Sequence, residues 1–286
     1  MMAPLTLSEN CPAPKPLGEA AGWTLGMISH GVPFRLSAKT KMLLELMRQQ
    51  APFGSLECPD LQAQACAFAL ENSESSARYV VTMDGEILTA DEPLRSALIE
   101  LGGQLMIHVA EYAPDYVFLH AGVVAWNDRA LLLPGVSHAG KSTLVAELVR
   151  GGAIYYSDEF ALLDSQGYVH PFSRDLRMRH PGRVEQSSIS LAQLKGRAGT
   201  GALPVSLVVF TEFAEHGEWS PKAITAGRAM LEMLLHATPV QREPSRVLAT
   251  LAAVMHHATA WRSQRGEATS VVSSLLAALA SGEAPA

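Results

Sequence analysis

The sequence predicts an α/β protein in two parts: a small α+β module over residues 1–113 and a larger domain with a mixed sheet over residues 114–286. Three features predict this fold class. A glycine-rich motif at residues 135–143 lies between an apolar strand-like run and an apolar helical stripe. The run before the motif is the second of two strand-like runs, which are joined by Asn127-Asp128. A short strand after the motif ends at the acidic pair Asp158-Glu159.

The N-terminal part is predicted to contain two helices and a small sheet. Apolar residues at helical spacing predict a helix over residues 40–50, and a longer helix is expected over residues 94–112. Runs at 63–70, 79–83 and 86–88 are typical of strands, with Asp84-Gly85 as a hairpin turn. Proline-rich residues 11–16 are expected to fray. This module either packs on the second part or recruits a substrate, and the lack of a Pro/Gly/Ser-rich linker favours close packing.

The glycine-rich motif has the complete spacing of a phosphate-binding P-loop. Such a turn exposes backbone N–H groups to phosphates, and the following helix presents its positive N-terminus to them. The residues expected to bind the nucleotide are Gly135, Val136, Ser137, His138, Ala139, Gly140, Lys141, Ser142 and Thr143. Within this set, Lys141 is expected to reach the β- and γ-phosphates and the Ser142 hydroxyl to bind Mg²⁺. The motif therefore predicts ATP and Mg²⁺ as ligands.

The motif is predicted to follow the second arm of an antiparallel hairpin. Strand-like runs at residues 117–126 and 129–133 are separated only by Asn127-Asp128, a pair that tolerates positive φ. In doubly wound nucleotide kinases the strand before the P-loop is instead reached through a helix. The hairpin argues against that architecture.

Two adjacent carboxylates follow the motif at the end of the next strand. Gly151-Gly152 is expected to end the P-loop helix, and residues 153–156 then form a strand that leads to Asp158-Glu159. Carboxylates in this position can bind Mg²⁺ and accept a proton from an attacking hydroxyl. A second hairpin is predicted from residues 160–163 and 168–170.

Four arginines cluster at residues 170–183, in a chain whose net charge is −6. Arg174, Arg177 and Arg179 are expected to bind nucleotide phosphates or an acidic substrate, since guanidinium groups match phosphate oxygens. The alternative interpretation is a solvated loop. The alternation over residues 175–179 predicts an edge strand.

Downstream, residues 204–210 predict a central strand, and residues 226–236, 245–261 and 269–280 predict helices. His236, His256 and His257 lack metal-ligand spacing and are interpreted as core or surface residues.

Composition argues against several classes of partner. With a pI near 5.9 and no dense basic patch elsewhere, the chain is not expected to bind nucleic acid. No apolar run has the length of a membrane span, and the first residues do not have the pattern of a signal peptide. Three cysteines without paired spacing suggest a reducing compartment. The predicted location is the cytoplasm.

Residues 119–123, 132–137 with 140–143, 148–152 and 156–159 resemble the catalytic domain of the HPr kinase/phosphorylase family. The chain is more similar still to the HPr-kinase-related proteins called kinase A, some of which are associated with a small PqqD-like protein. The resemblance covers about residues 117–180, with a weaker similarity over 205–240. It implies a fold like that of phosphoenolpyruvate carboxykinase, with a mixed sheet and a P-loop fed by a hairpin. The first hundred residues do not resemble the family's regulatory domain.

The resemblance implies roles for individual residues. It makes His120 the catalytic histidine. A single histidine on an apolar strand is more often a core residue, and its position one hairpin before the P-loop makes the two interpretations equally good. The resemblance makes Asp158 the base and acid of the reaction. Glu159 stands where the family has a second aspartate that assists the metal, and His138 where many members have glycine. These two departures are the features that favour a nucleotide-binding module without catalysis.

The predicted function is transfer of the γ-phosphoryl group of ATP to a serine or threonine of a small protein or peptide. A small-molecule acceptor and a non-catalytic ATP- or ADP-binding regulatory module are the alternatives, and simple ATP hydrolysis ranks last. The acceptor, the reverse phosphorolysis and the oligomeric state are left open. Classical members of the HPr kinase family form hexamers. The N-terminal part of this chain differs from theirs, so the resemblance alone does not predict a hexamer here, and a homo-oligomer is one open alternative.

Overall fold

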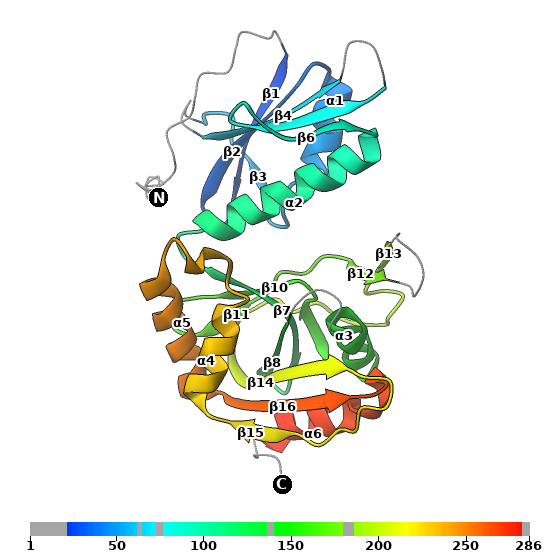
Figure 1. The fold of residues 1–286 in the computed structure, drawn as a ribbon, viewed down its shortest axis with the longest axis vertical. Coiled ribbons are helices and arrows are strands. Elements are labelled where there is room, and N and C mark those ends of the chain that lie inside the picture. Colours follow the sequence, from blue (N-terminus) through cyan, green and yellow to red (C-terminus); the bar gives the residue numbers. More distant parts are fainter. Residues whose placement is uncertain (1–21, 62–64, 73–76, 136–139, 180–185, 282–286) are drawn as a thin grey trace. The chain divides into compact units, whose positions relative to one another are not determined.

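The computed structural model describes residues 22–61, 65–72, 77–135, 140–179 and 186–281. These residues form a mixed α/β structure with two mixed sheets and six α-helices (Figure 1). The chain divides into two compact units, residues 1–115 and 116–286, whereas the sequence places the boundary after residue 113. Residues 136–139 of the P-loop and the proline-rich residues 11–16 lie outside the described part.

The first unit is built on a six-stranded sheet with the order β3-β1-β2-β4-β5-β6. Its pairs are antiparallel except for β2 and β4, which run parallel. The strands are β1 (Trp23–Ser29), β2 (Val32–Ala38), β3 (Leu56–Glu57), β4 (Cys66–Asn72), β5 (Tyr79–Met83) and β6 (Glu86–Glu92). The helices are α1 (Lys41–Arg48) and α2 (Leu94–Tyr112). The predicted bounds of the long helix and the turn at Asp84-Gly85, where both residues have positive φ, are confirmed.

The β1–β2 hairpin was not predicted from the sequence. Its turn is His30-Gly31, where φ is 48° and 81°. Strand β4 spans Cys66–Asn72, and the predicted start at residues 63–64 lies outside the described residues. Strand β6 continues to Glu92, beyond its predicted end at residue 88.

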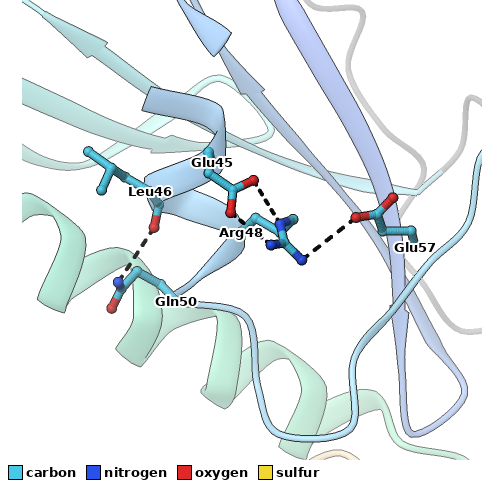
Figure 2. A network of polar contacts seen from close by, with 5 residues as sticks. All are labelled: Glu45, Leu46, Arg48, Gln50 and Glu57. Carbon is cyan, nitrogen blue, oxygen red and sulfur yellow. Dashed lines mark hydrogen bonds and ion pairs between the residues drawn. The ribbon is translucent and has the colours of Figure 1, made fainter. Parts of the chain in front are cut away.

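Helix α1 begins at a side-chain cap and carries an exposed polar network. The hydroxyl of Thr40 accepts a hydrogen bond from the N–H of Leu43 at 3.3 Å. Figure 2 shows Arg48 donating to both carboxylate oxygens of Glu45, at 2.9 and 2.7 Å, and pairing with Glu57 at 3.7 Å. Such exposed pairs contribute little stability. The helix is held on the sheet mainly by its buried residues Leu43, Leu44 and Met47.

His108 on α2 is buried in the first unit between the rings of Phe68 and Tyr112, whose centroids lie 5.6 and 4.9 Å away. Burial lowers its pKa to about 4, although the charge of Asp84 opposes this shift. The folded-state pKa lies below the unfolded value of about 6.5. The resulting stabilisation is therefore complete above that unfolded value and is lost as the pH falls toward 4.

We expect the free energy of unfolding to fall between pH 7 and pH 4.5, with His108 contributing at most about 3 kcal/mol. His108→Phe should reduce this pH dependence in denaturant titrations at a series of pH values. His257 is exposed on α5, so His257→Phe is the matched control. It should leave the pH dependence of the free energy of unfolding unaltered. An equal pH dependence in wild type and His108→Phe would refute this account of the buried ring.

The second unit is built on an eight-stranded mixed sheet. The order is β11-β10-β7-β8-β14-β16-β15, and β9 pairs with β7. Strand β14 runs parallel to both β8 and β16 and lies between them, which confirms its predicted central position. The strands are β7 (Val117–Trp126), β8 (Arg129–Pro134), β9 (Ile154–Ser157), β10 (Phe160–Leu163), β11 (Tyr168–His170), β14 (Leu203–Phe213), β15 (Lys222–Ile224) and β16 (Thr259–Arg265).

Helices cover both faces of this sheet (Figure 1). They are α3 (Lys141–Arg150), α4 (Ala226–Leu234), α5 (Pro244–His257) and α6 (Val272–Ser281). Side chains alternate along β8, so Leu132 packs in the cluster with α4 and α5, whereas Leu131 and Leu133 pack with α3 and α6. A separate two-stranded sheet consists of β12 (Leu176–Arg179) and β13 (Gln186–Ile189), so the predicted strand at 175–179 is confirmed.

Both hairpins of the second unit were predicted correctly. Strands β7 and β8 are antiparallel neighbours, and φ is positive at Asn127 and Asp128. Strands β10 and β11 pair in the same way. The helix predicted over residues 245–261 is wrong in its last part, because α5 ends at His257 and β16 follows. The other two helices are shorter than predicted, since α4 ends at Leu234 and α6 begins at Val272.

Candidate functional site

Strand β7 brings the predicted site residues together, because it pairs with β8, β9 and β10. The carbonyl of His120 on β7 accepts a hydrogen bond from the N–H of Gly135 at 3.4 Å. The next residue, Ala121, donates its N–H to the carbonyl of Glu159 at 3.1 Å. The start of the P-loop, the acidic pair and His120 therefore meet at the same place on the sheet.

The P-loop motif is described at Gly135 and from Gly140 to Thr143, while Val136, Ser137, His138 and Ala139 lie outside the described residues. Gly140 is the N-cap of α3 with φ of 78°, a left-handed conformation that favours glycine. It has no side chain with which to cap the helix. The N–H groups of Lys141, Ser142 and Thr143 lack partners within the helix, which is the arrangement that binds phosphate.

Lys141 is buried at the first turn of α3, with 8% of its surface exposed. Its Nζ donates a hydrogen bond to the carbonyl of Gly135 at 2.6 Å, so the side chain lies across the two ends of the motif. Burial lowers the pKa of Lys141 to about 8, and the charge of Asp158 opposes the shift. The ammonium group is therefore still mostly protonated at neutral pH.

Asp158 is also buried, with 5% of its surface exposed. The hydroxyl of Tyr155 donates to its Oδ1 at 3.0 Å. Burial, followed by the charge of Asp158, raises the pKa of Tyr155, which keeps that hydroxyl a donor. Ser157 fixes the turn, since its Oγ accepts from the N–H groups of Glu159 and Phe160 at 3.1 and 3.0 Å. The supporting roles of Tyr155 and Ser157 were not predicted from the sequence. For Ser157 a signal exists, because a serine just before a turn often bonds to the backbone of that turn.

Glu159 and Arg174 form an ion pair with each other. The sequence assigns Glu159 to Mg²⁺ and Arg174 to phosphate, so this pair would have to open before either residue took its predicted role. Arg177 and Arg179 lie on β12, and their side chains lie outside what the structure describes. Within the described residues, no group of three or more His, Cys, Asp and Glu side chains could hold a metal ion.

His120 is partly buried, and its ring centroid lies 5.7 Å from that of Phe160. Burial first, and then the positive charge of Lys141, lower its pKa to about 4, so the ring is neutral at neutral pH. His236 is close by, because its carbonyl accepts the N–H of His120 at 2.8 Å. Burial and Lys141 lower the pKa of His236 as well. The sequence treats His236 only as a core or surface residue and gives no signal for this proximity.

No family model and no curated protein matches the chain. Among the helices that the structure describes, none is long and apolar enough to cross a membrane.

For the kinase function that the sequence predicts, Tyr155→Phe is expected to slow phosphoryl transfer by about ten-fold, because Asp158 loses a hydrogen-bond donor that fixes its carboxylate. The variant is checked by steady-state kinetics with saturating ATP. Tyr156→Phe is the matched control, since the Tyr156 hydroxyl donates to the carbonyl of Gly201 at 2.7 Å and not to the site. Equal rates for the two variants would show that Tyr155 does not orient Asp158.

Proposed function

We propose that the chain is a kinase that transfers the γ-phosphoryl group of ATP to a serine or threonine hydroxyl of a small protein or peptide. One observation carries the proposal: buried Lys141 and Asp158 interact electrostatically at the N-terminus of α3, beside His120 on β7. A phosphate-binding turn, a cation and a carboxylate are the parts that phosphoryl transfer requires. The hairpin before the P-loop supports a fold like that of phosphoenolpyruvate carboxykinase, as the resemblance to HPr kinase implies.

Each residue has a chemical task in this proposal. The N–H groups at the start of α3 and the Lys141 ammonium bind the phosphates. Asp158 accepts the proton of the acceptor hydroxyl while the oxygen of that hydroxyl bonds to the γ-phosphorus. The bond from that phosphorus to the β,γ-bridging oxygen breaks, and ADP leaves. Neutral His120 can donate a hydrogen bond to the transferred group without competing with Lys141 for Asp158.

Mg²⁺ would neutralise charge on the β- and γ-phosphates. The Ser142 hydroxyl and the Glu159 carboxylate are hard oxygen donors of the kind that this ion prefers. Their use requires Arg174 to exchange Glu159 for a phosphate oxygen, for which its guanidinium is chemically suited. On this proposal Arg174 and Arg179 remain candidates for phosphate binding.

The proposal extends to the partner and the location. A PqqD-like small protein is the candidate acceptor, and the cytoplasm is the compartment that supplies ATP. A homo-oligomer is compatible with this function. A second candidate, a non-catalytic module that binds ATP or ADP, is favoured by one observation, the ion pair that engages Glu159.

The test is incubation of the purified chain with γ-labelled ATP, Mg²⁺ and a fractionated cell lysate. We expect a labelled small protein that carries phosphoserine or phosphothreonine. Lys141→Met should abolish the label, whereas the matched variant Lys222→Met, at an exposed position on β15, should not. Tight nucleotide binding without transfer to protein or small molecules would support the binding module. Absence of magnesium-nucleotide binding would contradict both functions.

A further inference from the structure

Arg265 reaches the P-loop helix from a distant part of the sequence. It is the last residue of β16, and its backbone pairs with Phe213 at the end of the parallel strand β14. Strand β8 is parallel to β14 on its other side and ends just before the P-loop. Because the carboxyl ends of parallel strands lie at one edge of a sheet, Arg265 lies at the edge where the phosphate-binding turn begins.

The guanidinium of Arg265 is buried and bonded to backbone. The residue is 1% exposed. Its Nη2 donates to the carbonyl of Gly140 at 2.8 Å, and its Nη1 to the carbonyl of Gly266 at 3.0 Å. Among the described residues, no carboxylate forms an ion pair with it and its Nε has no hydrogen-bond partner. Burial lowers the pKa of Arg265, and the charge of Glu267 opposes this shift. A buried cation without a direct ion pair is unfavourable for folding, which indicates a use other than stability.

The bond to Gly140 has a direct consequence for the phosphate-binding turn. The peptide between Gly140 and Lys141 is planar and trans, so its carbonyl and its N–H point in opposite directions. The carbonyl accepts two bonds, one from the N–H of Leu144 at 3.1 Å and one from Arg265. With the carbonyl held on that side, the N–H of Lys141 is fixed toward the opening of the helix, where a phosphate would bind.

Arg265 also determines which residue can occupy position 140. A Cβ added to Gly140 would lie 2.4 Å from Nη2 of Arg265, closer than any real contact. The guanidinium therefore occupies the space that a side chain at 140 would need, in addition to the constraint of positive φ.

We infer that Arg265 is a positioning residue for the polyphosphate of the nucleotide: it fixes the Gly140–Lys141 peptide with its N–H toward the phosphates, and its buried positive charge attracts them. This inference rests on the proposed nucleotide-binding function. It assigns the terminus of β16, which carries no motif, to the binding of the donor nucleotide.

The first test compares Arg265→Met with Arg265→Lys. Methionine keeps most of the apolar volume but has no donor and no charge. We expect the Kd for magnesium-ATP to rise about ten-fold or more in Arg265→Met, and less in Arg265→Lys, which keeps the charge. The thermal unfolding midpoint without nucleotide should not fall in Arg265→Met, because a buried charge without a direct ion pair is removed. A purely structural role would lower the midpoint, and unchanged ATP affinity would overturn the inference.

Arg262→Met is the matched control, since Arg262 is an exposed arginine on the same strand and pairs with Glu232. It should leave ATP affinity unchanged. Gly140→Ala should add less loss of affinity in the Arg265→Met background than in wild type, because the close contact with Nη2 is gone. Strict additivity of the two changes would contradict the contact.

A second test does not need the nucleotide. Amide hydrogen exchange at Leu144, whose N–H is bonded to the carbonyl of Gly140, should be faster in Arg265→Met than in wild type or in Arg262→Met, since the turn loses its anchor. Equal exchange would overturn the positional part of the inference. If the wild-type chain bound no magnesium-ATP, the proposed function would be wrong, and the exchange rates would still decide whether Arg265 orders this turn.

Discussion

Replacing Asp158 with asparagine is expected to lower the rate of phosphoryl transfer by about 10²–10⁴-fold, the usual contribution of a general base. Asparagine has nearly the same size and can still accept the hydrogen bond from Tyr155, so the local structure should persist. The amide cannot take the proton of the acceptor hydroxyl. Binding of magnesium-ATP should change much less than the rate. Single-turnover transfer and calorimetric titration on the same preparation measure the two effects separately.

Asp128→Asn is the control for this substitution. Asp128 lies in the exposed turn between β7 and β8 with φ of 57°, a conformation that asparagine tolerates. Asp128→Asn makes the same chemical change as Asp158→Asn, but at the opposite end of the hairpin from Gly135. The rate of transfer in Asp128→Asn should equal that of wild type. A wild-type rate in Asp158→Asn would remove Asp158 from the mechanism, even if ATP still bound.

Gly140→Ala is expected to weaken magnesium-ATP binding at least ten-fold and to lower the free energy of unfolding by about 1–2 kcal/mol. Alanine must adopt a left-handed conformation at φ near 78°, and its Cβ would collide with Nη2 of Arg265. The strain at φ is relieved by rotating the peptide that presents the N–H of Lys141, and the collision is relieved by moving the guanidinium that holds this peptide. Equilibrium nucleotide titration and chemical denaturation measure the two quantities.

Gly227→Ala provides the comparison, because a Cβ at this position in the first turn of α4 meets nothing within 4 Å. It should leave affinity unchanged and stability unchanged or slightly higher, since alanine favours helix. Equal behaviour of the two alanine variants would mean that the left-handed turn at 140 is not needed for binding.

Local signals explain why much of the second unit could be predicted. The turn dipeptide Asn127-Asp128 and the runs around it are sufficient to define the β7–β8 hairpin, and the P-loop motif itself places the start of α3. The β1–β2 hairpin lacked such signals. Gly26 and Pro33 interrupt its strands, and Gly26 is needed because a Cβ there would lie 2.4 Å from the carbonyl of Cys58.

The missed parts of the site depend on contacts between distant residues. No glycine or proline separates α5 from β16, so the sequence pattern extended the helix to Trp261 and the strand that carries Arg265 was missed. The bond from Arg265 to Gly140 joins residues 125 positions apart. Nothing near either residue in the sequence indicates it, since it follows from the parallel pairing of β16 with β14.

The pairing of β7 with β8, β9 and β10 has a consequence for synthesis of the chain. These strands all lie between Val117 and Leu163, so they leave the ribosome close together and can assemble early. The same span carries His120 on β7, Lys141 on α3 and Asp158 between β9 and β10. Strand β16 is made later, after α5. On the proposed function, a nascent chain would thus hold these three side chains before it holds Arg265, and would gain full affinity for ATP only when β16 has docked.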